Sequence, residues 1–142
     1  MSFITTIARK AAQAAKVMSI QTSEAKSQLL NDMAKALRDN TKKILQANAL
    51  DINFAQEKSL SEAMVDRLQL NEARIEDMAI GLETVASIPE VVGTLREQDV
   101  RPNGLKISKM RVPLGVICMI YEARPNVTAD AAGLCIKSGN AV

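Results

Sequence analysis

Residues 115–120 read Gly-Val-Ile-Cys-Met-Ile, an uninterrupted apolar run in the last third of the chain. Such a run is typical of a strand that is buried on both faces, as in a parallel sheet. A polar turn over residues 121–126 follows it, and an Ala-rich helix is expected over about 128–137 with Gly139 as its C-cap. Residues 140–142 have the pattern of a further strand. This order predicts the opening βαβ unit of a doubly wound α/β sheet.

A parallel sheet needs at least one more strand than these residues supply. We therefore expect the 142-residue chain to be the front part of a longer protein, cut off in mid-strand.

The first ninety residues are predicted to be helical, because apolar residues recur at intervals of three and four. The first helix is expected over residues 2–18. The expected N-caps of the later helices are Thr22 or Ser23, Thr41 and Asn71. Pro89 is expected to end the last of them. Amphipathic packing alone accounts for these positions.

Residues 95–101 and 105–112 flank Pro102-Asn103-Gly104, a turn tripeptide that predicts a β-hairpin. Neither face of the hairpin is purely apolar. We therefore expect an exposed ribbon that covers a neighbouring subunit of a homo-oligomer. The expected organisation is a helical region over 1–92, the ribbon over 93–112 and the start of an α/β domain over 113–142.

The chain contains no histidine, and its formal net charge is +2. Without imidazole there is no Ser-His-Asp triad and no zinc site of the usual kind, so no metal is expected. The small net charge argues against nucleic acid as a partner, and no apolar run approaches the roughly 20 residues that span a membrane. Cys118 and Cys135 form no disulfide framework, which indicates a reducing compartment, the cytoplasm. Both are predicted to be inert core thiols.

In open α/β sheets, ligands gather where the carboxyl ends of strands lead into helices. Here that loop contains Arg124, a bidentate donor for phosphate or carboxylate, and Pro125, which stiffens the turn. Asn126 either caps the following helix or donates its amide to a developing oxyanion. The spacing of the residues leaves both roles open for Asn126.

Three stretches carry a resemblance to a known family. Residues 121–128 read YEARPNVT, residues 137–142 read KSGNAV, and residues 45–55 read LQANALDINFA. With the residues around them, these stretches resemble the γ-glutamyl phosphate reductases of the aldehyde dehydrogenase superfamily over the whole chain. Ordinary aldehyde dehydrogenases instead carry Pro-Trp-Asn at the corresponding turn. Cys118 departs from the family pattern, which has a small residue there, usually glycine.

The resemblance implies an aldehyde dehydrogenase-like three-layer αβα cofactor-binding domain, of which this chain holds the first βαβ unit. It implies reduction of L-glutamyl 5-phosphate with NADPH to L-glutamate 5-semialdehyde and phosphate, the second step of L-proline biosynthesis. Asn126 matches the family's oxyanion-stabilising Asn, and the expected NADP(H)-binding residues are Glu122, Ala123, Arg124 and Pro125. The nucleophilic cysteine of the family lies beyond residue 142, so the chain alone is expected to be inactive.

Two alternatives remain at this level. The chain is a non-catalytic helical fragment that uses its ribbon to bind a partner, or it belongs to a bifunctional kinase–reductase. An Arg-Gly-Gly directly after Val142 and a later Cys-Asn pair would identify the reductase.

Overall fold

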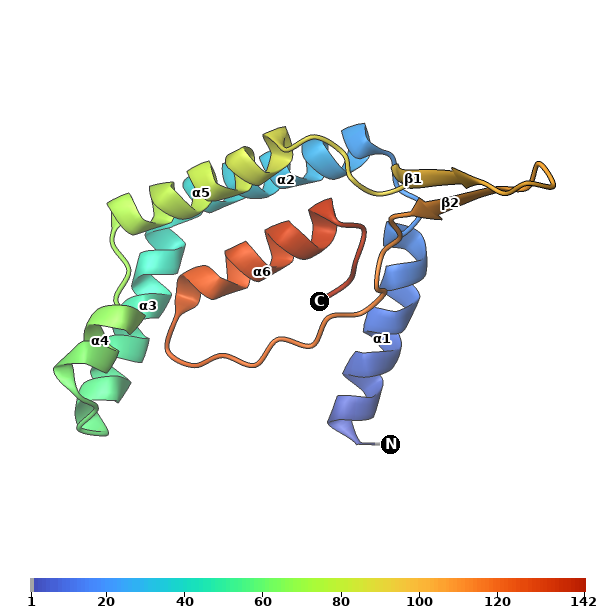
Figure 1. Ribbon diagram of the computed structural model, residues 1–142. Helices are drawn as coiled ribbons and strands as arrows, with labels where there is room; N and C mark the ends of the chain where they lie inside the picture. The colour runs from blue at the N-terminus through green and yellow to red at the C-terminus, as the bar shows by residue number, and fades with distance from the viewer. Residues whose placement is uncertain (1) are drawn as a thin grey trace.

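The computed structural model describes residues 2–142 as an α-rich fold with one two-stranded antiparallel sheet (Figure 1). The elements in chain order are α1 (Phe3–Met18), α2 (Ser23–Asp39), α3 (Thr41–Glu57), α4 (Glu62–Leu68), α5 (Glu72–Ser87), β1 (Leu95–Val100), β2 (Lys106–Met110) and α6 (Pro125–Lys137). No helix within residues 2–142 is long and apolar enough to cross a membrane.

Two of the predicted N-caps are confirmed. Thr22 accepts a hydrogen bond from the Ala25 amide at 3.2 Å, and Asn71 accepts one from the Arg74 amide at 2.7 Å. The prediction that Thr41 caps α3 is wrong, because Asn40 occupies the cap position and Thr41 is already helical. Since α2 and α3 meet with no loop between them, the Thr41 hydroxyl instead donates to carbonyls at the end of α2.

The core lies where α2, α5 and α6 meet, with α6 packed against the antiparallel α2–α5 pair (Figure 1). Leu30 and Ala34 of α2 and Ala79 of α5 are fully buried in it. Small residues allow close approach of the helices: a Cβ added at Gly133 of α6 would lie 2.8 Å from Leu82 Cδ2. The helical stripe predicted for α5 therefore faces this core.

Two buried lysines hold the carboxyl end of α5. Lys137 Nζ donates to the Ala86 carbonyl at 2.8 Å and lies 2.9 Å from Ser27 Oγ. Lys26 Nζ lies 2.5 Å from a carboxylate oxygen of Glu90. The Lys137 contact satisfies a carbonyl in the last turn of α5, and the Lys26 contact joins α2 to the segment that follows α5.

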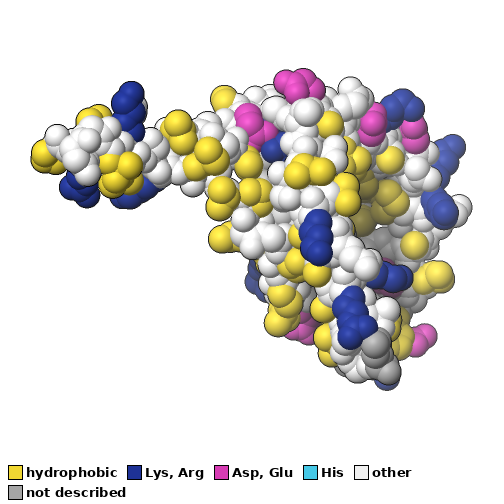
Figure 2. All heavy atoms as spheres, turned by 90° about the vertical axis from the view of Figure 1, so that its right-hand side faces the viewer, with side chains coloured by type: hydrophobic (Ala, Val, Ile, Leu, Met, Phe, Trp, Pro, Cys, Tyr) yellow, Lys and Arg dark blue, Asp and Glu magenta, His cyan; other side chains and the backbone are white. Residues whose placement is uncertain are grey.

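The predicted hairpin is confirmed. β1 and β2 pair in register from Leu95 opposite Met110 to Val100 opposite Lys106, with an irregularity between Arg96 and Gln98. Every residue of both strands is exposed, and the hairpin projects from the helical body (Figures 1 and 2). Apolar and basic side chains lie along the projecting ribbon (Figure 2).

The predicted strand over 115–120 is reduced to one parallel bridge between Val116 and Ala141. The Ile117 amide donates to the Ala141 carbonyl at 2.8 Å, and the Ala141 amide donates to the Gly115 carbonyl at 2.9 Å. The parallel direction agrees with the βαβ prediction, but burial on both faces is wrong: Ile120 is 92% exposed. Residues 140–142 are the only part of the described chain that pairs with this run.

The two cysteines therefore differ. Cys118 is exposed, so its prediction as a core thiol is wrong, because no element within residues 2–142 covers the apolar run. Cys135 is buried in α6 as predicted, and burial raises the pKa of its thiol. Raising that pKa keeps the Cys135 thiol protonated and unreactive at neutral pH.

The end of α6 follows the prediction for Gly139. With Gly139 at φ +74°, its amide donates to the Ile136 carbonyl and the Asn140 amide to the Cys135 carbonyl, which is a Schellman ending. The buried Asn140 side chain then accepts a hydrogen bond from the Gly115 amide at 2.7 Å. This contact fixes the start of the apolar run against α6.

Candidate functional site

The loop before α6 sets the position of the predicted site residues. The helix begins at Pro125, three residues earlier than predicted, and Arg124 is its N-cap residue with φ −141° and ψ 86°. A residue before proline is pushed out of the helical region, and proline fits the first helical position, so the Arg-Pro pair fixes this start. Asn126 therefore lies inside the first turn. The capping role considered for Asn126 is wrong.

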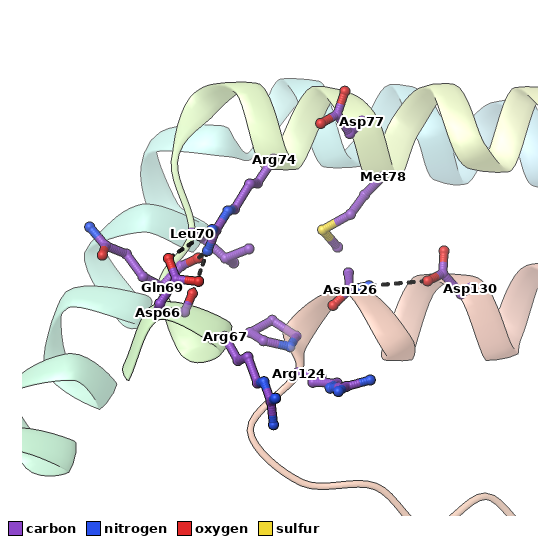
Figure 3. A pocket seen from close by; sticks show the side chains of 11 residues that line it. Asp66, Arg67, Gln69, Leu70, Arg74, Asp77, Met78, Arg124, Asn126 and Asp130 are labelled. Atoms are coloured by element: carbon purple, nitrogen blue, oxygen red, sulfur yellow. Dashed lines mark hydrogen bonds and ion pairs between the residues drawn. The ribbon is translucent and has the colours of Figure 1, made fainter. Parts of the chain in front are cut away.

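The Asn126 side chain lies on the surface of α6 across from Met78 of α5 (Figure 3). Its Nδ2 donates to a carboxylate oxygen of Asp130 at 3.3 Å. An amide nitrogen carries two N–H groups, so one of them is left to donate to another acceptor. This arrangement is compatible with an amide that stabilises negative charge on a bound molecule.

The residues just before the helix form a tight exposed turn. Ala123 has φ +47°, a left-handed conformation that is uncommon for a residue with a side chain. The hydroxyls of Tyr121 and Thr128 lie 2.6 Å apart and close the turn onto α6. Glu122 is exposed, and Ala123 and Pro125 are half-buried. The turn therefore places Glu122, Ala123 and Arg124 directly before the start of α6.

A pocket of about 400 Å³ lies between the α4–α5 junction and the start of α6 (Figure 3). Three of the predicted site residues, Arg124, Pro125 and Asn126, line it, whereas Glu122 and Ala123 do not. The remaining lining residues are Asp66, Arg67, Gln69, Leu70, Arg74, Asp77, Met78 and Asp130. Sequence reasoning missed the members from α4 and α5, because no local spacing connects residues that lie about fifty positions apart.

The charged groups of the pocket fall into two kinds. Arg74 is held in place: its guanidinium donates to the Gln69 carbonyl at 2.6 Å and to an Asp66 carboxylate oxygen at 3.0 Å. The guanidinium groups of Arg67 and Arg124, by contrast, take part in no hydrogen bond or ion pair with any other residue in 2–142. Two guanidinium groups are thus free to bind a carboxylate or a phosphate.

Nothing in the described part of the chain suggests a metal centre. No group of three or more His, Cys, Asp or Glu side chains within residues 2–142 is arranged to hold a metal ion. The acidic residues at the pocket are spread over α4, α5 and α6.

The sequence that carries these residues is similar to the sequences of known proteins. No protein-family model matches the chain. It is 56% identical over 142 residues to the γ-glutamyl phosphate reductase of Shewanella denitrificans, a match that covers 100% of this chain and 34% of the relative. It is 55% identical over 135 residues to that of Caldanaerobacter subterraneus, covering 95% of this chain and 33% of the relative. The chain thus spans about a third of the length of these relatives.

Solved structures agree. The crystal structure of γ-glutamyl phosphate reductase from Thermotoga maritima matches with a TM-score of 0.89 and 41% identity, over 94% of this chain and 32% of that one. The enzyme from Saccharomyces cerevisiae matches with a TM-score of 0.92 and 33% identity, over 99% of this chain and 36% of that one. The resemblance drawn from the YEARPNVT and KSGNAV stretches is confirmed: along its whole length the chain is homologous to about one third of a γ-glutamyl phosphate reductase.

Proposed function

We propose that this chain forms part of an oxidoreductase that reduces L-glutamyl 5-phosphate with NADPH to L-glutamate 5-semialdehyde and phosphate, the second step of L-proline biosynthesis. The observation that carries the proposal is the 56% identity to a γ-glutamyl phosphate reductase over all 142 residues, which include the Asn126 turn. The matches support this reading and give no support to a non-catalytic interaction fragment.

The chemistry assigns Asn126 a role in the transition state. A cysteine thiolate, which this proposal places outside the chain, displaces phosphate from the acyl carbon, and NADPH supplies a hydride when bound. Each addition to the acyl carbon places negative charge on its oxygen. The free N–H of the Asn126 amide donates to that oxygen, a type of contact that contributes about 3–4 kcal/mol to transition-state stabilisation.

The turn before α6 fits an anionic cofactor. Arg124 of this turn offers an unpaired guanidinium, and the positive end of the α6 dipole lies next to it. We assign Glu122, Ala123, Arg124 and Pro125 to the binding of NADP(H) on this basis. Arg124 is the contact for an anionic group.

The organisation follows from the same proposal. Residues 113–142 are the start of a three-layer αβα NADP-binding domain, and the parallel bridge between Val116 and Ala141 around α6 supports this assignment. Residues 1–92 are a helical region. The projecting ribbon over 93–112 is the surface proposed to cover a second subunit. The unpaired cysteines fit a cytoplasmic enzyme.

The test uses a chimera in which this chain replaces the matching third of the Shewanella denitrificans relative. The unsubstituted chimera is expected to oxidise NADPH with L-glutamyl 5-phosphate, and to run the reverse reaction with L-glutamate 5-semialdehyde, phosphate and NADP⁺. Asn126→Ala is expected to lower kcat about 100- to 1,000-fold while leaving the affinity for NADPH unchanged.

Two further variants separate the roles in the loop. Asn126→Asp places a negative charge against the oxyanion, so a stable variant with near-normal turnover would rule out the oxyanion role. Arg124→Ala is expected to raise the KM for an anionic ligand, with a smaller effect on kcat.

A further inference from the structure

Arg67 is a pocket residue that the proposed reaction does not yet use. It lies in α4, a helix of the N-terminal region, yet lines the same pocket as Asn126 and Arg124 of α6 and its preceding loop. Its guanidinium has no hydrogen-bond or ion-pair partner within residues 2–142. Figure 3 places Arg67 and Arg124 on the same side of the pocket.

Hydrogen bonds from two side chains fix the backbone around Arg67 at the end of α4. The buried side chain of Asn48 donates to the Leu68 carbonyl at 2.9 Å and accepts from the Leu70 amide at 2.7 Å. On the other side, the guanidinium of Arg74 donates to the carbonyls of Asp66 and Gln69. The end of α4 is therefore a rigid support for a side chain that is itself free. A supported, unpaired guanidinium at a pocket wall is suited to bind a ligand.

The charges along the pocket have both signs. Beyond the two free arginines, the carboxylate of Asp130 lies on α6 beside Asn126, whereas that of Asp77 points away from α6 (Figure 3). The carboxylate of Asp130 disfavours a ligand end with negative charge alone on its side of the pocket. A ligand end that carries a carboxylate and an ammonium on one carbon can match both charges.

We infer that the pocket binds the α-amino-acid end of the substrate, with the guanidinium of Arg67 on the α-carboxylate; this inference rests on the function proposed above. Arg67 is thus a substrate-specificity residue supplied by the helical region. Asp130 provides the negative field for the α-ammonium group. The reacting end of the substrate extends toward Asn126.

The chimera described above tests this assignment in the reverse reaction, in which L-glutamate 5-semialdehyde, phosphate and NADP⁺ are varied separately. Arg67→Ala is expected to raise the KM for the semialdehyde about 10- to 100-fold, the usual worth of a charge-assisted hydrogen bond, with kcat changed less than about twofold. Arg67→Lys keeps the charge and is expected to recover part of this loss.

The matched control is Arg9→Ala on α1, an exposed arginine outside the pocket lining, which is expected to leave all three KM values unchanged. Circular dichroism of each variant checks that α4 and α5 remain folded. A rise confined to the KM for phosphate would place Arg67 on the phosphate end and overturn the inference. A rise confined to the KM for NADP⁺, or no change in any KM, would also overturn it.

A second measurement separates this inference from the proposed reaction. If the unsubstituted chimera has no NADP-dependent activity, the proposed function fails. The 142-residue chain is then titrated with L-glutamate and, separately, with inorganic phosphate, while the Arg Nε–H signals are followed by NMR. A saturable response of the Arg67 signal to L-glutamate, with no response of the Arg9 signal in the same sample, supports the pocket as an amino-acid site. No response to L-glutamate, or a response to phosphate alone, overturns it.

Discussion

Two regions of the molecule are rich in apolar residues but lie in opposite environments. One is the helical core of α2, α5 and α6, and the other is the run over residues 115–120. In the helical core, Leu30, Ala34 and Ala79 have no exposed surface. In the run, Ile120 is 92% exposed and Cys118 is exposed as well. The helices cover one another, whereas the run pairs only with residues 140–142.

This difference shows that an apolar pattern indicates how much surface a segment must bury. It does not indicate whether the segment that covers this surface is close in sequence. α2 and α5 are separated by about thirty residues and find each other within the described chain. A strand of a parallel sheet needs a neighbouring strand and covering layers on both faces. Within residues 2–142, the run has one neighbour on one edge.

The largest expected effect comes from truncating the core. Leu30→Ala is expected to lower the free energy of unfolding by about 2–5 kcal/mol, since the side chain is fully buried between α2 and the facing helices. Leu114→Ala, just before the run, is the matched control. Leu114 is 85% exposed, so its truncation is expected to cost less than about 0.5 kcal/mol. Urea denaturation measures both, and equal losses would mean that the run is covered in solution.

The next largest effect on stability is expected at the contact that joins the two regions, the hydrogen bond between Asn140 and the Gly115 amide. Asn140→Ala removes the acceptor of the Gly115 amide and is expected to cost about 1–3 kcal/mol, because Asn140 is buried. Asn126→Ala, an exposed asparagine in the first turn of the same helix, is expected to cost far less. Thermal and urea unfolding of the two variants compare them. A loss at Asn126 as large as that at Asn140 would contradict the assignment of Asn126 to a site and not to a structural contact.

A smaller effect is expected at the start of α5. Asn71→Ala removes the cap hydrogen bond to the Arg74 amide and is expected to cost about 1 kcal/mol. Asn71→Asp is expected to retain most of the stability, since a carboxylate accepts the same hydrogen bond and favours the helix dipole. The check is chemical denaturation of both variants, and a stable Asn71→Ala protein would mean that packing alone sets the start of α5.

The smallest expected effect is the loss of stability at acid pH that arises from the ion pairs between α2 and α5. Arg38 of α2 donates hydrogen bonds to Glu76 and Glu83 of α5, and these bonds hold the pKa of both carboxyls below the ordinary value of 4.5. Since the pKa is lowered by folding, this stabilisation is present above about pH 4.5 and is lost as the pH falls through the lowered values. Arg38→Met is expected to flatten the decline of stability below pH 4.5. An unchanged acid profile in that variant would show that the ion pairs contribute nothing.

The amino-acid sequence by itself determined the local structure. Thr22 and Asn71 cap their helices because a cap needs only a side chain and an amide three residues away. The hairpin around residues 102–104 and the Schellman ending at Gly139 are local in the same sense. The YEARPNVT and KSGNAV stretches also identified the family. The sequence prediction began α6 three residues too late, but the observed start is also local, because Pro125 restricts the backbone of Arg124.

Only the tertiary structure decided which distant residues share a site. Arg67 has no local pattern that sets it apart from other surface arginines, and its place in the same pocket as Asn126 depends on how α4 and α5 pack beside α6. The exposure of Cys118 likewise depends on which elements cover residues 115–120. Burial and pocket formation depend on contacts between residues far apart in the chain, whereas caps and turns depend on hydrogen bonds over three or four residues. That difference in range is why the sequence predicted the elements and the family but could not predict the pocket.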